Sequence, residues 1–145
     1  PPRPPRVKLV LFTVEEANRL LTELRPRFER LVEAKREFDR TRARMDVLGL
    51  ATAGAGQENP DVIELRRLQE RYNTLAELIS NGVSSIHRRG CVIKDLDSGL
   101  LDFYALNGDR LVFLCWKLGE AEIAHWHPID AGFSDRQPIS HSELD

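Results

Sequence analysis

The densest group of chemically capable side chains lies late in the sequence, where Cys115 is followed ten residues later by a His-x-His pair, His125 and His127. In a strand, residues separated by one position point to the same side, so the two imidazoles can bind one metal ion. Imidazole, thiolate and carboxylate donors together suit zinc or ferrous iron. A paired thiol and imidazole can alternatively act as a nucleophile and its base.

Whether these side chains meet depends on the register of the last expected hairpin. A two-residue loop at Glu120-Ala121 pairs Cys115 with Trp126 and separates the thiol from the histidines. A three-residue loop from Gly119 to Ala121 pairs Cys115 with His125, and we favour it because it keeps Trp126 among apolar neighbours. It gathers four side chains on one polar face, which we predict as a metal site for zinc or iron: Asp102, Cys115, His125 and His127.

Helical periodicity dominates the first half of the chain. Thr13 and Glu16 have the spacing of a capping box, so a helix is expected to begin at Thr13, and apolar residues recur at helical spacing to about Leu48. Pro26 lies inside this pattern, where proline removes a backbone hydrogen bond and clashes with the carbonyl four residues back. We expect a kink or break there, so that an N-terminal helix turns aside and a hairpin helix begins at Arg27.

A second hairpin helix is expected from Pro60 to Asn81, after a flexible connection at 49–58. Asn59 provides a helix cap and Pro60 the first helical position, while Asn81-Gly82 suits a left-handed helix end. The segment has the same length as that from Arg27 to Leu48. The two helices can therefore pair antiparallel.

After Arg89 the period changes to that of β-strands, which continues to His127. Asn107-Gly108 is the pair preferred for a type I′ hairpin, and with it as the loop Asp102 lies opposite Phe113. One face is then apolar and is expected to form the core under the first helix: Leu101, Phe103, Val112, Leu114 and Trp116. We expect an irregular C-terminal arm over residues 128–145.

The composition is that of one soluble globular domain, with 145 residues, 41% hydrophobic and 30% charged. No apolar run approaches the ~18 residues of a membrane span, and no secretory signal is seen, so we expect a cytoplasmic protein without a membrane partner. The expected fold is a single α+β domain over residues 1–145. It has an arm and short strand at 1–12, a helical part at 13–82 and a β part at 83–127. The long hairpin and N-terminal helix pack on an antiparallel sheet of three or four strands.

The helices indicate two kinds of partner. Two helices alone cannot bury the apolar ring along the hairpin, so we expect a homodimer, or docking on another protein. Residues 1–50 carry a net charge of +4 and the remainder −6, and arginines along the first helix can contact the phosphates of RNA or of a ribosome: Arg25, Arg27, Arg30, Arg36, Arg40 and Arg44. Interspersed glutamates favour intrahelical ion pairs instead. The leading hypothesis is a non-enzymatic interaction module, ahead of a metal- or thiol-dependent site and of RNA binding.

Several short motifs also resemble a known family. They are Phe12 to Asn18, Gly99 to Phe103, Leu114 to Glu120, and Trp126-His127 with Gly132-Phe133 and Arg136. Together they resemble the bacterial domain-of-unknown-function family DUF2203 over most of the chain, from Phe12 to Ile139. The resemblance implies a small stand-alone bacterial protein with a helical hairpin and a β-rich end, and it implies no activity.

Overall fold

The computed structural model describes residues 9–141 and 144. Two long helices are followed by five strands: α1 (Val14–Ala51), α2 (Pro60–His87), β1 (Cys91–Asp95), β2 (Leu100–Asn107), β3 (Arg110–Lys117), β4 (His125–Pro128) and β5 (Gln137–Pro138). The strands form one antiparallel sheet in the order β1-β2-β3-β4-β5. The α+β fold expected from the sequence, with a helical hairpin packed on an antiparallel sheet, is confirmed.

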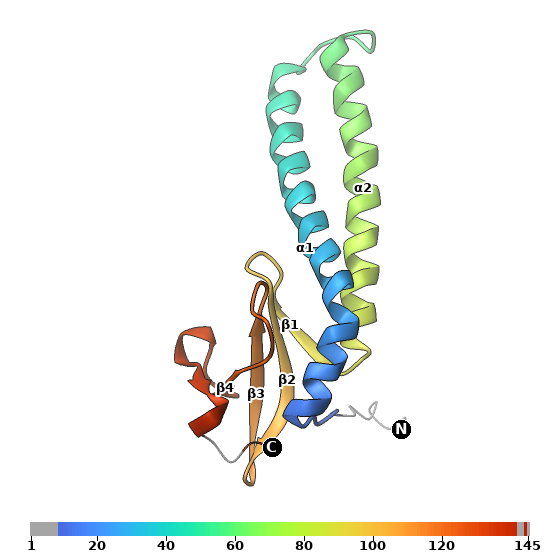
Figure 1. The fold of residues 1–145 in the computed structure, drawn as a ribbon. Helices are drawn as coiled ribbons and strands as arrows, with labels where there is room; N and C mark the ends of the chain where they lie inside the picture. Colours follow the sequence, from blue (N-terminus) through green and yellow to red (C-terminus); the bar gives the residue numbers. More distant parts are fainter. Residues whose placement is uncertain (1–8, 142–143, 145) are drawn as a thin grey trace, which may run out of the picture.

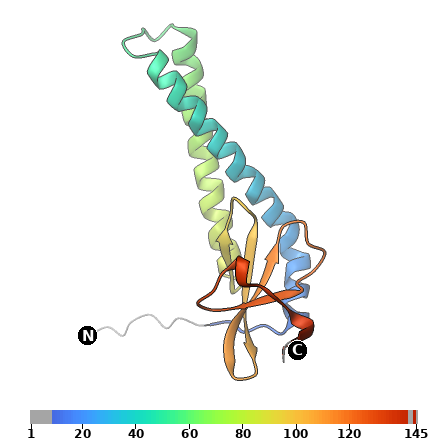
Figure 2. The ribbon, with the colours of Figure 1, turned by 90° about the vertical axis from the view of Figure 1, so that its left-hand side faces the viewer.

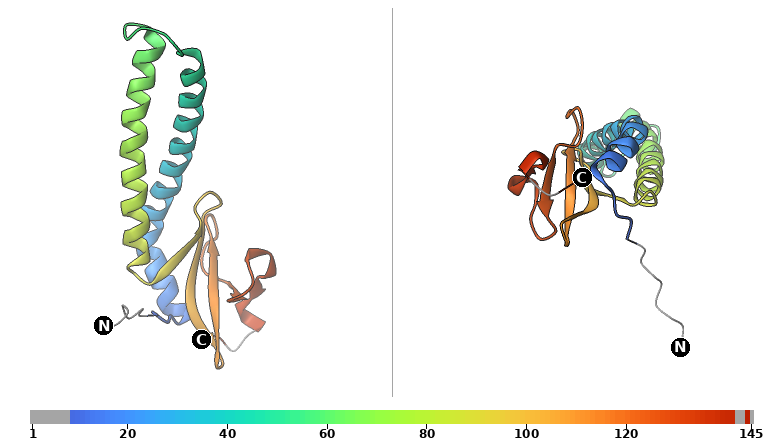
Figure 3. Two further views of the ribbon diagram at one scale, coloured as in Figure 1. Left: turned by 180° about the vertical axis from the view of Figure 1, so that it is seen from behind. Right: turned by 60° about the horizontal axis from the view of Figure 1, so that its bottom comes forward.

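The molecule has a layered base and a projecting arm. Figure 1 shows the first half of α1 against the sheet and the second half running on beside α2, well beyond the strands. Figure 2 shows the C-terminal segment crossing the opposite face of the sheet. The view from below in Figure 3 places the sheet between this segment and the helices. Both faces of the sheet are therefore covered, by different parts of the chain.

Helix α1 runs through Pro26 without a break, so the separate N-terminal helix expected from the sequence is absent. Its start is confirmed, because Thr13 and Glu16 form the capping box. Pro26 and Thr22 are both exposed, so water can satisfy the Thr22 carbonyl that loses its helical partner. Buried apolar residues lie on both sides of the proline and hold the helix together across it: Leu21, Leu24, Phe28 and Leu31.

Helix α2 begins at Pro60 with Asn59 as its cap, as predicted, but it does not end at Asn81-Gly82. The helix passes through Gly82, where an added Cβ would lie 2.8 Å from Leu31 Cδ1 of α1. The glycine therefore serves close contact between the helices. The left-handed residue that follows the end of the helix is Gly90, with φ +97°.

The β2–β3 hairpin is displaced by two residues from the predicted register. Asn107 pairs with Arg110, so Gly108 and Asp109 are the central turn residues, and Gly108 has φ +64°. One positive φ, at the first central position, is typical of a type II′ turn, whereas the expected type I′ turn needs two. A shift of two residues preserves which side chains share a face, and the predicted core face is buried. It changes the partner of Asp102 from Phe113 to Cys115.

The two ends of the chain differ in part from expectation. Leu9 to Phe12 form no strand, although the Phe12 N–H donates to the Tyr104 carbonyl oxygen at 2.8 Å, and the rest of the predicted arm and strand lies outside the described residues. The C-terminal arm contributes β5, a fifth strand that pairs with β4. Two residues are too short to show a strand period in the sequence. Within residues 9–141 and 144, neither helix contains a stretch apolar enough to cross a membrane.

Exchange of Gly90 for alanine tests the end of α2. Gly90→Ala places a side chain at positive φ and sets its Cβ 2.6 Å from Val10 Cβ. Gly119→Ala also places a side chain at positive φ, +102°, but no atom of the described residues lies within 4 Å of its Cβ. We expect Gly119→Ala to lose about 1 kcal/mol of unfolding free energy and Gly90→Ala to lose more, in urea denaturation. Equal losses would show that Val10 does not pack on this turn.

Candidate functional site

Three strands bring together Asp102, Cys115 and His127, which we call the sheet-face cluster. Asp102 pairs with Cys115 across β2 and β3, and His127 on β4 pairs with Phe113, two positions from Cys115 on the same face. All three side chains are buried, with exposed fractions of 1%, 1% and 2%. One donor atom from each lies within 4.8 Å of the others. Because these donor atoms lie so close together, the group could hold a metal ion. The cluster occupies the face of the sheet opposite α1.

His127 contacts an oxygen at each ring nitrogen. Nδ1 lies 2.8 Å from the Pro128 carbonyl oxygen, and Nε2 lies 2.9 Å from Asp102 Oδ2. Because a carbonyl oxygen only accepts hydrogen bonds, Nδ1 carries a proton. The contact between Nε2 and Asp102 Oδ2 needs one further proton, which lies on either His127 or Asp102. The pair is therefore electrically neutral as a unit. Burial raises the pKa of the Asp102 carboxyl, against the opposing charge of His127.

Cys115 is a protonated thiol at neutral pH. Burial, with the charge of Asp102 and its hydrogen bonding as further causes, raises the pKa of Cys115 to about 12. Arg136 acts in the other direction and favours the thiolate. A nucleophilic cysteine needs a lowered pKa and exposure to substrate, and Cys115 has neither.

An ion pair between Arg136 and Glu120 borders the cluster. The guanidinium nitrogens lie 2.8 and 3.0 Å from the two Glu120 carboxylate oxygens, and Glu120 Oε1 also accepts from the Lys117 N–H at 2.6 Å. Partial burial would raise the pKa of Glu120, but the hydrogen bonds from Arg136 and Lys117 outweigh it and lower the pKa. Arg136 also lies over the Phe133 ring, 4.2 Å from its centroid. These contacts tie the C-terminal segment to β3.

His125, the fourth predicted ligand, is not a member of the cluster. The predicted pairing of Cys115 with His125 is confirmed, but the His125 Nδ1 atom lies 3.8 Å from Glu120 Oε2, beside the ion pair. Three of the four predicted side chains thus meet at one point. The sequence pattern could not distinguish His127, which joins the cluster, from His125, which does not. Both histidines lie on the same face of the sheet and differ only in their distance from Asp102.

A cavity of about 100 Å³ adjoins the cluster, and its wall includes Lys94, Leu100 and residues 131–133 of the C-terminal segment. The Lys94 ammonium lies 4.1 Å from the centroid of the Phe113 ring. The sequence patterns did not predict the wall of this cavity or the ion pair between Glu120 and Arg136. The sequence places Glu120 in the loop of the last expected hairpin, and no pattern in the arm marks Arg136 as its partner.

Comparison with known proteins gives a family and no activity. The family model described as uncharacterized conserved protein (DUF2203) matches residues 10–139, which include both helices and the whole sheet-face cluster. No curated protein and no solved structure matches the chain.

Thiol accessibility tests the state of the cluster. Cys91 and Cys115 are buried, and burial raises their pKa values to about 11 and about 12. We expect neither thiol to react with iodoacetamide in the native protein at neutral pH, and both to react in denaturant. Rapid native alkylation that disappears in Cys115→Ser would contradict this and restore the nucleophile hypothesis.

Removal of the Arg136 guanidinium should destabilise the protein in a pH-dependent way. Because the pKa of Glu120 is lowered in the folded state, its stabilisation is present above the ordinary value of 4.5 and is lost as the pH falls through the folded value. We expect Arg136→Met to lose about 1 kcal/mol at neutral pH, and the difference from wild type to shrink on acidification, in urea denaturation. Arg19→Met, which breaks an exposed pair with Glu15, is the control and should change little. A gap that does not vary with pH would contradict the assignment.

Proposed function

We propose that this chain, which belongs to the DUF2203 family of uncharacterised proteins, is a protein-interaction module. Its helical hairpin associates with a second copy of the chain. The family itself supplies no activity. The observation that carries this proposal is the incomplete burial of the hairpin. In α2 only Leu75 and Ile86 are buried, and beyond Ala34 in α1 only Thr41 and Leu48 are. Two helices that contact each other over this length leave much of their apolar surface in water.

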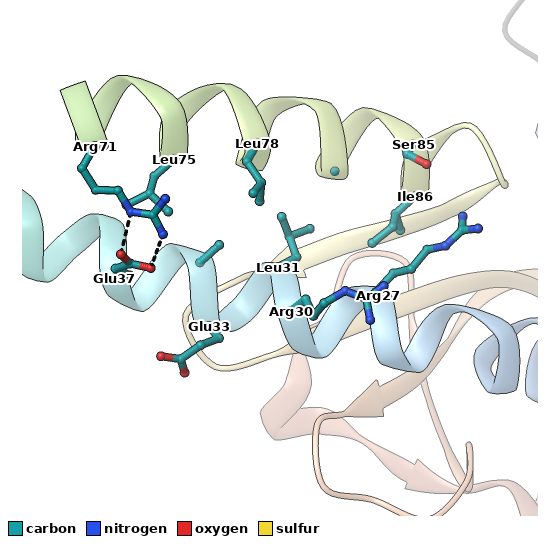
Figure 4. A pocket seen from close by; sticks show the side chains of 12 residues that line it. Arg27, Arg30, Leu31, Glu33, Glu37, Arg71, Leu75, Leu78, Ser85 and Ile86 are labelled. Carbon is teal, nitrogen blue, oxygen red and sulfur yellow. Dashed lines mark hydrogen bonds and ion pairs between the residues drawn. The ribbon is translucent and has the colours of Figure 1, made fainter. Parts of the chain in front are cut away.

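An apolar groove between the helices gives the contact surface. Figure 4 shows Leu31 of α1 pointing toward Leu78 and Ile86 of α2, with Leu75 further along α2 beside Arg71. The groove has a volume of about 490 Å³, and Leu78 is 48% exposed at its edge. Apolar side chains of a helix fit such a groove. Packing hairpin against hairpin would produce a four-helix bundle.

The charges at the rim favour a second copy as the occupant. Arg27 and Arg30 lie at one end of the groove, and Glu33 and Glu37 lie one to two turns further along α1. In a two-fold contact with the α1 helices antiparallel, the arginines of one copy face the glutamates of the other. Because Glu33 and Glu37 already pair with arginines of their own chain, the arginines of the second copy would join these pairs. Within the part of the chain that the structure describes, neither Arg27 nor Arg30 forms a salt bridge. The rim is thus self-complementary.

The charge pairs on the hairpin support self-association over RNA or ribosome binding. Arg44 pairs with Glu64 and Arg71 with Glu37, which links the two helices, while Arg36 and Arg40 pair with Glu33. These arginines are partly neutralised within the hairpin. Phosphate contacts require a basic surface whose charge is free to displace counterions.

A metal-dependent function of the sheet face is the second candidate, with zinc or iron as the cofactor. The convergence of a carboxylate, a thiol and an imidazole in the sheet-face cluster favours it. The thiol-dependent variant is not supported, because the pKa of Cys115 is raised and its side chain is buried.

Light scattering after gel filtration tests the association. We expect a mass of two chains at micromolar concentration, and a monomer for Leu78→Arg, which places a charge in the groove at a side chain that is already half-exposed. Leu106→Arg, at a leucine of 47% exposure on the β2–β3 hairpin, is the matched control and should remain dimeric. A wild-type monomer with full helical circular dichroism would overturn the proposal.

A further inference from the structure

We propose that Asp102, Cys115 and His127 bind one divalent transition-metal ion, for which the donor set favours zinc. The inference rests on the second candidate function and gives it a defined site. It concerns the face of the sheet opposite the hairpin, so it is independent of self-association.

The spacing of the donors suits a single ion. Zinc bonds to sulfur, nitrogen and oxygen are about 2.0 to 2.3 Å long, so a tetrahedral ion holds its ligand atoms about 3.3 to 3.8 Å from one another. The three donor atoms of the cluster lie within 4.8 Å of one another without an ion. Side-chain rotations that bring the donor atoms up to about 1 Å closer together would complete the site.

The surroundings already orient two of the ligands. His127 uses Nδ1 to donate to the Pro128 carbonyl, which leaves Nε2 facing the cluster, and this is the arrangement by which zinc-bound histidines are held. Asp102 Oδ1 is buried and receives no hydrogen bond from an N–H or O–H group of the described residues, although the Cys115 thiol hydrogen-bonds to the carboxylate. An unsatisfied buried carboxylate oxygen is costly, and a bound cation removes that cost.

The charge balance permits a divalent ion. Without metal, the cluster holds the Cys115 S–H proton and the proton between His127 Nε2 and Asp102 Oδ2, and it is neutral. When the ion binds, both protons leave to solvent, and the Asp102 carboxylate and Cys115 thiolate balance the two positive charges. The buried site stays neutral, and the nearby Arg136 favours the thiolate form.

Three protein ligands leave a coordination position open. The cavity of about 100 Å³ beside the cluster, bounded by Lys94 and residues 131–133, has room for a water or a small molecule there. Zinc sites with three protein ligands and an open position are typical of catalysis, whereas structural sites have four protein ligands. The geometry therefore points to an open site.

Titration of tag-free, fully reduced protein with Zn²⁺ tests the inference. Calorimetry should give one ion per chain. Titration with Co²⁺ should give a thiolate-to-cobalt charge-transfer absorption in the near ultraviolet. A stoichiometry well below one ion per chain, or a cobalt spectrum without the charge-transfer band, would overturn the assignment of the ligands.

Matched variants separate this site from others. Cys115→Ser and Asp102→Asn should each weaken zinc binding by more than ~10-fold, whereas Cys91→Ser, at the second buried cysteine, and His125→Ala, two residues from His127, should leave it unchanged. Absence of zinc binding by the wild-type chain would overturn both the metal-dependent function and this site. Binding that persists unchanged in a folded Cys115→Ser variant would overturn the site alone. If that variant does not fold, the cobalt spectrum of the wild type decides.

Discussion

The structure depends on covering the apolar side of one uninterrupted 38-residue helix. The first half of α1 packs on the sheet, where Phe28 meets Trp116 edge-on with ring centroids 6.0 Å apart. The second half packs against α2, and near the middle of α1 Gly82 of α2 allows close approach to Leu31. One helix thus joins a well-buried core to a half-buried hairpin. The energy gained along the core lets the helix continue through Pro26, which costs ~3 kcal/mol in a helix interior.

The same helix also positions the segment that leads to the candidate site. Asn18 Oδ1 accepts from the Ile123 N–H at 2.8 Å, and Arg25 donates to the Ala121 carbonyl at 2.6 Å. These contacts fix the irregular segment between β3 and β4, so β4 returns with Cys115 opposite His125. The placement of His127 beside Asp102 therefore follows from α1, although α1 lies on the other face of the sheet.

Local rules predicted what local interactions determine. The caps at Thr13 and Asn59 were identified because a cap is formed by residues a few positions apart. The two faces of the sheet were correct even though the β2–β3 register was wrong by two residues, because side-chain direction depends only on parity. The continuity of α1 at Pro26 and of α2 at Gly82 is decided by packing between distant segments. The pair of Glu120 and Arg136 is of the same kind, since it joins a turn to an arm without regular structure.

The hairpin and the sheet-face cluster, which both lack an assigned role, differ in which groups are exposed to water and which are buried. On the hairpin, apolar groups remain in water, and this is the condition that association with another surface relieves. On the sheet face, polar groups are out of water and reach neutrality by sharing protons, and this is the condition that a cation relieves. Lys35 connects the regions, since its ammonium pairs with Asp39 of α1 and with Asp97 of the β1–β2 turn, three residues before Leu100 in the cavity wall. The carboxylates of Asp39 and Asp97 are exposed, so these ion pairs contribute little energetic coupling between the hairpin and the cluster. Hairpin and cluster can thus be occupied independently.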